Sequence, residues 1–258
     1  MRIATFNILN GRAPHERVVN EVRYADAIAS LGADVLALQE VDRNQPRSGG
    51  ADLTAIAAMA IGAVDQRFEP ALLGTPETPW RPPTGDERPS GPAYGIALLS
   101  RYPVLRWDAF GLPRMRARSP YVLRDPRRLV WVREEPRAAL LAELDTPLGR
   151  VRVLTTHLSF LPWCNGHQLR TLARRVEESE VPTVLAGDLN LRARRAARAT
   201  RMRPALRGPT FPAEEPTVQL DHILVSGGLH AVSGGPVPLP VSDHLALVAG
   251  LQRGPAQQ

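Results

Sequence analysis

The sequence predicts a mixed α/β fold in a single domain, and three observations lead to that prediction. Short apolar runs of strand length recur along the 258 residues and alternate with segments of helical periodicity. A hydrophobic fraction of 43% is enough for a sizeable core, and 22% charged residues is ordinary for a globular protein. The chain shows no break in composition and no repeat of fixed period. We therefore expect one domain over residues 1–252, followed by a frayed tail over 253–258.

The N-terminal part alternates predicted strands and helices. A strand over 2–8 precedes a helix over about 16–31, which Gly32 ends. The apolar face of this helix is expected to hold Val18, Val22, Ala25 and Ala29. Residues 35–39 form an unbroken apolar run, as in a strand buried on both sides, and 53–61 form an Ala-rich helix. The order of strand, helix, strand and helix indicates a layered arrangement.

The rest of the chain continues the pattern and includes two irregular segments. Residues 74–93 contain six prolines and three glycines and are predicted to be a surface loop. Residues 111–136 are predicted to be a second irregular segment, which is basic. Further strands are predicted over 94–100, 138–144, 151–156, 183–186, 223–225 and 245–251, and a helix over 167–176.

The composition and the missing motifs exclude several classes of function. No apolar stretch approaches the ~20 residues of a membrane helix, and the N-terminus has no secretory pattern. The single Cys164 excludes an intrachain disulfide, so we expect a cytoplasmic protein and a monomer. Zinc-binding Cys and His motifs, a nucleophilic serine elbow and a Gly-rich phosphate loop are all absent from the sequence.

The formal charge is +6, and every Lys or Arg position is Arg. The arginines concentrate in segments 114–133 and 192–207, which flank candidate catalytic positions. Arg forms bidentate contacts with phosphate that Lys does not form, and a positive rim steers anionic substrates inward. Two interpretations stay open at this point: a rim that attracts an anionic substrate, or a solvated surface produced by an Arg-biased composition.

Six short apolar runs carry polar residues suited to phosphoryl chemistry at their ends. They are Thr5-Phe6-Asn7, Leu38-Gln39-Glu40, Thr155-Thr156-His157, Gly187-Asp188-Leu189-Asn190, Leu220-Asp221-His222 and Ser242-Asp243-His244. In layered α/β folds, active sites are assembled at the edge where such strands stop and loops begin. We therefore expect these segments to meet at one edge of a sheet.

The residue types in these segments favour hydrolysis at phosphorus. Asp188 and Asn190 are two residues apart, so on extended backbone their side chains point to the same side. A carboxylate and an amide that face one pocket can orient a water and bind a phosphoryl oxygen. A histidine side chain has an unperturbed pKa near neutral pH, so His244 is a candidate general base. For each motif taken alone, the structural alternative is an ordinary turn or a buried histidine.

The order of these motifs resembles the endonuclease/exonuclease/phosphatase superfamily, which has the deoxyribonuclease I-like fold. The resemblance spans residues 7 to 244 and includes the segment Leu98-Leu99-Ser100-Arg101-Tyr102-Pro103-Val104. It implies an α/β fold of four layers, a sandwich in which two mixed β-sheets pack face to face with helices outside. It also implies a metal-dependent phosphoester hydrolase.

The resemblance implies a catalytic role for five residues. His244 is the expected base, Asp221 its partner, and Asp188 the group that positions the attacking water. His157 and Asn190 are expected to hold the non-bridging phosphate oxygens. Arg137 resembles an Arg found at this position in several branches, and it is expected to clamp the phosphate.

The resemblance places a divalent metal at Glu40, with Asn7 and Asp243 beside it. Oxygen ligands of this kind suit Mg²⁺, so the expected cofactor is Mg²⁺, with Mn²⁺ as the alternative. Leu9 stands where some branches carry an Asp, which leaves the metal shell of this protein partly open.

The expected activity is hydrolysis of a phosphodiester by in-line attack of an activated water, as in generic bacterial members. Segment 187–192 matches the Gly-Asp-x-Asn-x-Arg element of inositol polyphosphate 5-phosphatases, but 219–222 departs from their Trp-Cys-Asp-Arg stretch. One alternative is a DNA or RNA nuclease whose basic segments follow a nucleic acid. Another is a lipid or inositol phosphate phosphatase or small-diester hydrolase, in which Trp80, Trp131 or Trp163 forms an apolar wall. A catalytically inactive binding scaffold is the third.

Overall fold

The structure is a computed structural model of the whole chain, and it describes every residue except 77–79, 85–86, 88–89, 116–117, 125–126 and 255–258. Part of the predicted surface loop 74–93 and most of the predicted tail 253–258 therefore lie outside the described residues, although Arg253 belongs to the last strand. Within the described part of the chain, no helix has the length and apolarity needed to cross a membrane.

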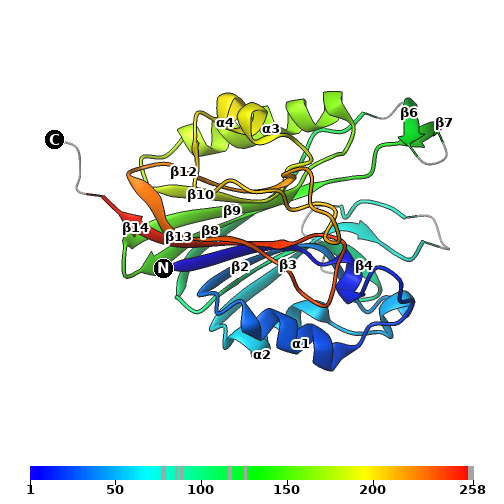
Figure 1. Cartoon of the computed structure of the whole chain (residues 1–258), viewed down its shortest axis with the longest axis horizontal. Helices are drawn as coiled ribbons and strands as arrows, with labels where there is room; N and C mark the ends of the chain where they lie inside the picture. Colours follow the sequence, from blue (N-terminus) through cyan, green and yellow to red (C-terminus); the bar gives the residue numbers. More distant parts are fainter. Residues whose placement is uncertain (77–79, 85–86, 88–89, 116–117, 125–126, 255–258) are drawn as a thin grey trace.

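The molecule has four layers, with two mixed six-stranded sheets between two pairs of helices (Figure 1). The first sheet consists, in spatial order, of β13 (Leu229–Val237), β14 (Ala246–Arg253), β1 (Arg2–Asn7), β2 (Val35–Arg43), β4 (Ala93–Ser100) and β3 (Asp65–Leu73). The second consists of β11 (Arg203–Pro204), β12 (Asp221–Val225), β10 (Thr183–Asp188), β9 (Gly149–His157), β8 (Ala138–Thr146) and β5 (Val104–Gly111). The predicted four-layer sandwich is confirmed.

The helices cover the outer faces of the sheets, and the apolar core follows these layers. Helices α1 (Glu21–Ser30) and α2 (Leu53–Ile61) pack on the first sheet, while α3 (Pro162–Glu177) and α4 (Ala193–Thr200) pack on the second (Figure 1). Successive residues of a strand face opposite layers, so Ile3 of β1 lies between the two sheets while Phe6 packs beneath the helices. The central strands are therefore apolar on both faces, which explains the unbroken run at the start of β2.

Local side-chain caps decide where the first two helices begin. Asn20 accepts a hydrogen bond from the backbone N–H of Arg23 at 3.0 Å, so α1 begins at Glu21 and the prediction of a start near residue 16 is wrong. Asp52 accepts bonds from Thr54 and Ala55 at 3.1 Å, and Gly62 ends α2 in the left-handed region. The predicted helix over 53–61 is confirmed.

The predicted apolar face of α1 is also wrong. Val18 precedes the helix and Val22 lies on its outer side, and their exposed fractions are 72% and 71%. The buried face consists of Tyr24, Ala27 and Ile28. Once the helix starts at Glu21, spacing of three and four residues from Tyr24 selects this face.

The sequence prediction missed elements that are half exposed. Strands β3, β5, β11 and β13 are the four edges of the two sheets, so only part of each is buried and none carries a continuous apolar run. Helix α4 was missed because it is rich in Arg. The predicted irregular segment 111–136 instead contains a two-stranded antiparallel sheet, β6 (Arg118–Arg124) with β7 (Arg127–Arg133).

Strand pairing brings distant segments to a common edge. β1 runs parallel to β2, and β9 runs parallel to β10. β12 is antiparallel to β10, with Asp188 opposite Asp221, and β14 is antiparallel to β1. The C-terminal ends of β1, β9 and β10 therefore meet the N-terminal ends of β12 and β14. The polar residues that were predicted at strand ends lie at the C-terminal end of some strands and at the N-terminal end of others.

Candidate active site

Asn7, the last residue of β1, connects the two sheets at the site. Its side-chain amide nitrogen donates to Glu40 Oε1 at 3.1 Å and to Asp188 Oδ2 at 3.1 Å. Glu40 belongs to the first sheet and Asp188 ends β10 in the second. Glu40 is not at a strand end as predicted, because β2 continues past it through an irregularity between Leu38 and Val41, where Glu40 has a φ of 56°. That irregularity re-aims the carboxylate toward Asn7.

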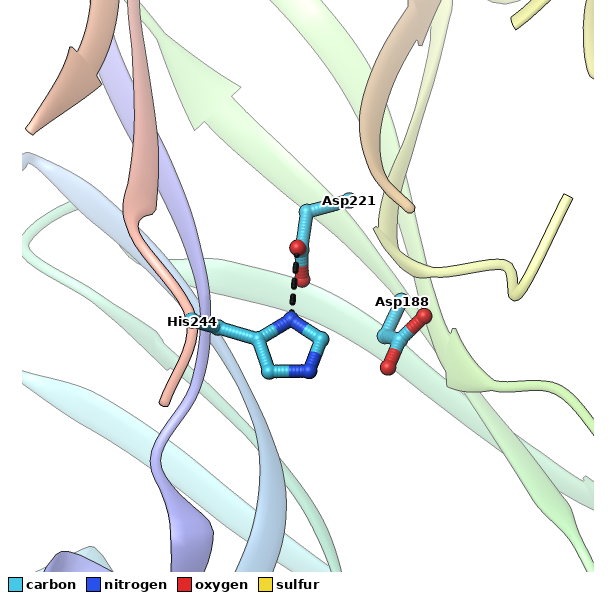
Figure 2. Close-up of side chains that lie close together, drawn as sticks. All are labelled: Asp188, Asp221 and His244. Carbon is cyan, nitrogen blue, oxygen red and sulfur yellow. Dashed lines mark hydrogen bonds and ion pairs between the residues drawn. The ribbon is translucent and has the colours of Figure 1, made fainter. Parts of the chain in front are cut away.

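His244 forms a buried hydrogen-bonded pair with Asp221. Its Nδ1 lies 2.8 Å from Asp221 Oδ2, and Asp221 is completely buried. Figure 2 shows Asp221 above the imidazole and Asp188 to one side of it, with the second ring nitrogen on the side away from Asp221. Burial lowers the pKa of His244, but the hydrogen bond and charge of Asp221, together with Asp188 and Asp243, outweigh burial and raise the pKa to about 9. A cation bound near the carboxylates would offset part of this increase.

The backbone around His244 is held by Ser242, whose role the sequence did not indicate. Its hydroxyl donates to the backbone oxygen of Asn7 at 2.5 Å and accepts from the N–H of His244 at 3.0 Å. Ser242 itself has a φ of 71°. The ring of Phe211 packs against the imidazole with a centroid distance of 4.8 Å. The base position is therefore tied directly to β1, 235 residues earlier in the chain.

His157 and Asn190 lie together beside Asp188. His157 Nε2 is 3.3 Å from Asn190 Nδ2 and 3.4 Å from Asp188 Oδ2. Asp188 Oδ1 also accepts a hydrogen bond from the backbone N–H of Asn190 at 2.9 Å. This contact is the ordinary Asx turn that the sequence analysis gave as the alternative to a catalytic role, and here the turn is part of the site. Burial lowers the pKa of His157 well below its usual value, and the nearby Arg137 and His244 add to the effect. His157 is therefore a neutral hydrogen-bonding group near neutral pH.

Arg137 precedes β8 and is 7% exposed. Its Nη2 donates to Glu135 Oε2 at 3.3 Å, and its Nε lies 3.8 Å from Glu134 Oε1. The positive charge of Arg137 lowers the pKa of both Glu40 and His157, which lie on different sheets of the site. Glu134 was not predicted; it is buried, and its other oxygen accepts a hydrogen bond from the hydroxyl of Ser159 at 2.5 Å, which offsets part of the cost of burial.

The carboxylates around Glu40 fit a hard divalent cation. Burial raises the pKa of Glu40, Asn7 lowers it through its hydrogen bond, and the negative charge of Asp243 raises it again. Two half-buried carboxylates that repel each other are suited to a dication with oxygen ligands. The amide oxygen of Asn7 accepts from the N–H of Leu9 at 3.2 Å, so its amide nitrogen faces the carboxylates. Leu9 therefore takes part in the site through its backbone N–H.

A second group of potential ligands lies next to the first. One ligand atom each from Asp188, Asp221 and His244 lies within 4.8 Å of the others, and all three residues are buried (Figure 2). Burial raises the pKa of Asp188, and the charge of Asp221 raises it further, so an additional positive charge would be stabilised here. The site as a whole brings every predicted catalytic residue to one edge shared by both sheets.

The sequence matches the model of the Endonuclease/Exonuclease/phosphatase family over residues 4–244. The chain belongs to this family. Its members are hydrolases that act on phosphate esters and generally depend on a divalent metal. No curated protein matches the sequence.

Several solved structures resemble this family member along most of the chain. An endonuclease/exonuclease/phosphatase from Beutenbergia cavernae is 25% identical, with a TM-score of 0.76, and the match covers 99% of this chain and 72% of that one. A mannosyl-6-phosphatase from Bacteroides thetaiotaomicron is 15% identical, with a TM-score of 0.63 and coverage of 98% and 99%. Sphingomyelinase C from Streptomyces griseocarneus is 17% identical, with a TM-score of 0.59 and coverage of 97% and 98%. The last two likenesses establish a common fold only.

Proposed function

We propose that this protein is a magnesium-dependent phosphodiesterase in which His244 and Asp221 activate the attacking water. The observation that carries the proposal is the 2.8 Å hydrogen bond between the buried Asp221 carboxylate and His244 Nδ1, with Asp188 beside the ring. Asp221 fixes the tautomer, which leaves Nε2 as the nitrogen that accepts a proton from water. Because the carboxylates raise the pKa of His244 to about 9, this role requires the neutral ring, which a cation bound near them would favour.

The remaining side chains would hold the phosphate and the water. Asp188 orients the water, and its own position is fixed by the amide of Asn7 and the N–H of Asn190. His157 and Asn190 would face the non-bridging oxygens, and the amide nitrogen of Asn190 would exchange one of its contacts, with His157 Nε2 or the backbone oxygen of Leu158, for a phosphate oxygen. Arg137 would add a positive charge to the same group. In-line attack then places the leaving oxygen on the side away from His244, because attacking and leaving oxygens are opposite each other.

Glu40 and Asp243 would hold Mg²⁺, or Mn²⁺ in its place, with Asn7 orienting the Glu40 carboxylate. When bound, the metal supplies charge neutralisation for the phosphoryl oxygens and the leaving group. Asp188, Asp221 and His244 are assigned to the water because the hydrogen bond between Asp221 and His244 Nδ1 suits a proton acceptor at Nε2, and the same three residues are the alternative metal site.

A nuclease is the second candidate, and one observation favours it. The segment that follows Asn190 leads directly into α4, where Arg192, Arg194, Arg195 and Arg198 are exposed. A nucleic-acid backbone that crosses the site would meet these cations. The mannosyl-6-phosphatase and the sphingomyelinase share the fold, so the fold by itself does not select among a sugar phosphate, a lipid diester and a nucleic acid.

The proposal is tested by a panel of substrates in Mg²⁺ and in EDTA, comprising plasmid DNA, RNA, bis-nitrophenyl phosphate, a phosphomonoester and sphingomyelin. Replacing His244 with Ala should lower the rate on the preferred substrate by at least ~10²-fold, because a positioned proton acceptor is lost. His230→Ala is the matched control, since His230 lies on β13 outside the site. Normal turnover by His244→Ala, with circular dichroism unchanged, would reject the assignment of the base.

A further inference from the structure

The β6–β7 hairpin pairs with neither of the six-stranded sheets and projects beyond the start of α3 (Figure 1). Its base is nonetheless attached to the site. Glu134, the residue after β7, accepts the hydroxyl hydrogen bond of Ser159, which lies two residues after His157. The hairpin therefore rises from the rim of the proposed active site.

The two faces of the hairpin have different environments. Tyr121 lies on the inner face, where its ring meets that of Phe160 edge-on at a centroid distance of 5.0 Å. The outer face holds Leu129 and Trp131, whose exposed fractions are 60% and 63%. Pro120 is paired with Trp131 and is also exposed. One face thus anchors the hairpin to the body of the protein, and the other presents apolar side chains to the solvent.

Other exposed apolar side chains collect at the same end of the molecule. Among the described residues, the three exposed large aromatic side chains are Trp131, Phe160 and Trp163, and Met115 is exposed as well. Cys164, next to Trp163, interacts with both Met115 and Glu134, so the start of α3 adjoins the base of the hairpin. We call Met115, Leu129, Trp131, Phe160 and Trp163 the hairpin rim. Single exposed aliphatic side chains occur elsewhere on the described surface, but the exposed aromatic rings occur only around this hairpin, with Trp131 on its outer face and Phe160 beside its inner face. We take this concentration of aromatic rings as the sign of an interaction surface.

The hairpin rim is surrounded by cations. Arg114, Arg118, Arg128 and Arg133 are all exposed, and none forms an ion pair with a carboxylate of the described residues. A cavity of about 410 Å³ at the base of the hairpin is lined by Arg114, Met115, Arg133 and Glu134. Two arginines against the single carboxylate of Glu134 leave this cavity with a positive charge that suits a phosphate-bearing headgroup.

We propose that the hairpin rim docks the protein on an anionic phospholipid surface, so that the site acts on a phosphate ester carried by that surface. Trp side chains favour the membrane–water interface, and Arg keeps its charged head among anionic headgroups while its stem stays apolar. Single-stranded nucleic acid would use the aromatic rings for stacking but gains little from Leu129 and Met115. The inference about the substrate rests on the proposed phosphoesterase function.

Sedimentation with vesicles tests the docking directly. The protein should bind vesicles made of equal parts phosphatidylcholine and phosphatidylglycerol, bind phosphatidylcholine vesicles more weakly, and lose affinity for the anionic vesicles at high salt. The double variant Leu129→Ser/Trp131→Ser should bind the anionic vesicles about tenfold or more weakly, because two interface-burying side chains are removed. Leu105→Ser/Val232→Ser is the matched control, since these side chains are 51% and 54% exposed on other strands.

Docking is overturned if wild-type protein binds neither vesicle, or if the double variant binds as well as the control while both keep the wild-type unfolding temperature. Binding to a single-stranded oligonucleotide that the same double variant weakens tenfold, without vesicle binding, would assign the surface to nucleic acid instead. Turnover of bis-nitrophenyl phosphate by the wild type is measured in parallel. Turnover without vesicle binding overturns the docking alone, whereas vesicle binding without any turnover overturns the proposed function and leaves the docking in place.

Discussion

Asn7 holds two carboxylates that would otherwise repel each other across the gap between the sheets. Its side-chain amide nitrogen donates to Glu40 and to Asp188, and its side-chain amide oxygen accepts a hydrogen bond from the backbone N–H of Leu9. One side chain thus sets the distance between the proposed metal-binding group and the proposed water-orienting group. The amide is well suited to this position because it provides two donors without adding a negative charge.

Replacing Asn7 with Ala should lower kcat by about 10²-fold, because both carboxylates lose a buried hydrogen-bond donor. Asn7→Asp should be at least as damaging, since it places a third carboxylate against two others. Steady-state kinetics at saturating Mg²⁺ measures the effect, and circular dichroism checks the fold. Wild-type kcat in both variants would show that the bridge has no part in the reaction.

Glu40 is the proposed metal ligand, and its replacement separates metal binding from the rest of the site. In Glu40→Gln the Mg²⁺ concentration for half-maximal rate should rise about tenfold or more, because a charged oxygen ligand is lost. Titration of activity with Mg²⁺ and calorimetry of Mg²⁺ binding provide two independent readings. If the Mg²⁺ concentration for half-maximal rate stays unchanged, the metal site is reassigned to the second group of ligands, Asp188, Asp221 and His244.

Sequence patterns identified the site residues that carry distinctive chemistry, but not the residues that position them. Asp188 and His244 stand in recognisable short motifs and adjoin each other in the structure. Glu134 and Ser242 were missed as contributors, because their partners Ser159 and Asn7 lie 25 and 235 residues away. A serine or glutamate of this kind looks ordinary until the fold brings its partner near. The catalytic and metal roles stay predictions until the variants are measured.

Helix α2 shows what makes an element predictable. An Asp at its N-cap, an Ala-rich body and a left-handed Gly62 after its last residue all agree, and the bounds Leu53–Ile61 follow from them. Edge strands such as β3 and β13 lack agreement of this kind, since one side of each is partly exposed and β13 contains Gly and Pro. Their existence depends on the neighbouring strand rather than on their own composition.

The caps provide a prediction at the same scale. Asp52→Ala removes the two hydrogen bonds that begin α2 and should cost about 1 kcal/mol of unfolding free energy, a decrease in Tm of roughly 2–4 °C. Glu21→Ala is the control, because Glu21 is exposed in the first turn of α1. Thermal unfolding followed by circular dichroism makes the comparison. Equal Tm values for the two variants would contradict the capping role.

The whole molecule depends on the apolar layer between the two sheets. Leu140 of β8 and Ile3 of β1 come from different sheets and are both completely buried in that layer. The family resemblance was needed to predict two face-to-face sheets, because apolar runs reveal strands but not which strands pair. The expected cytoplasmic location and monomeric state stay predictions.

Leu140→Ala should lower the free energy of unfolding by about 2–5 kcal/mol, because it leaves a cavity in a close-packed layer. Urea unfolding followed by tryptophan fluorescence measures the loss. Leu105→Ala on edge strand β5 should cost much less, since Leu105 is 51% exposed. A loss below that of Leu105→Ala would show that the layer between the sheets is not the main core.

The position of β1 between β2 and β14 has a consequence for the order in which the protein matures. A ribosome-bound chain that has reached residue 225 already contains every strand of the second sheet. At that moment β1 still lacks one of its two neighbours, and the proposed proton acceptor has not been translated. β1 can therefore pair with its second neighbour only after β14 has been synthesised. His244 lies just before β14 in the chain, so the first sheet and the active site are completed at the same stage of synthesis.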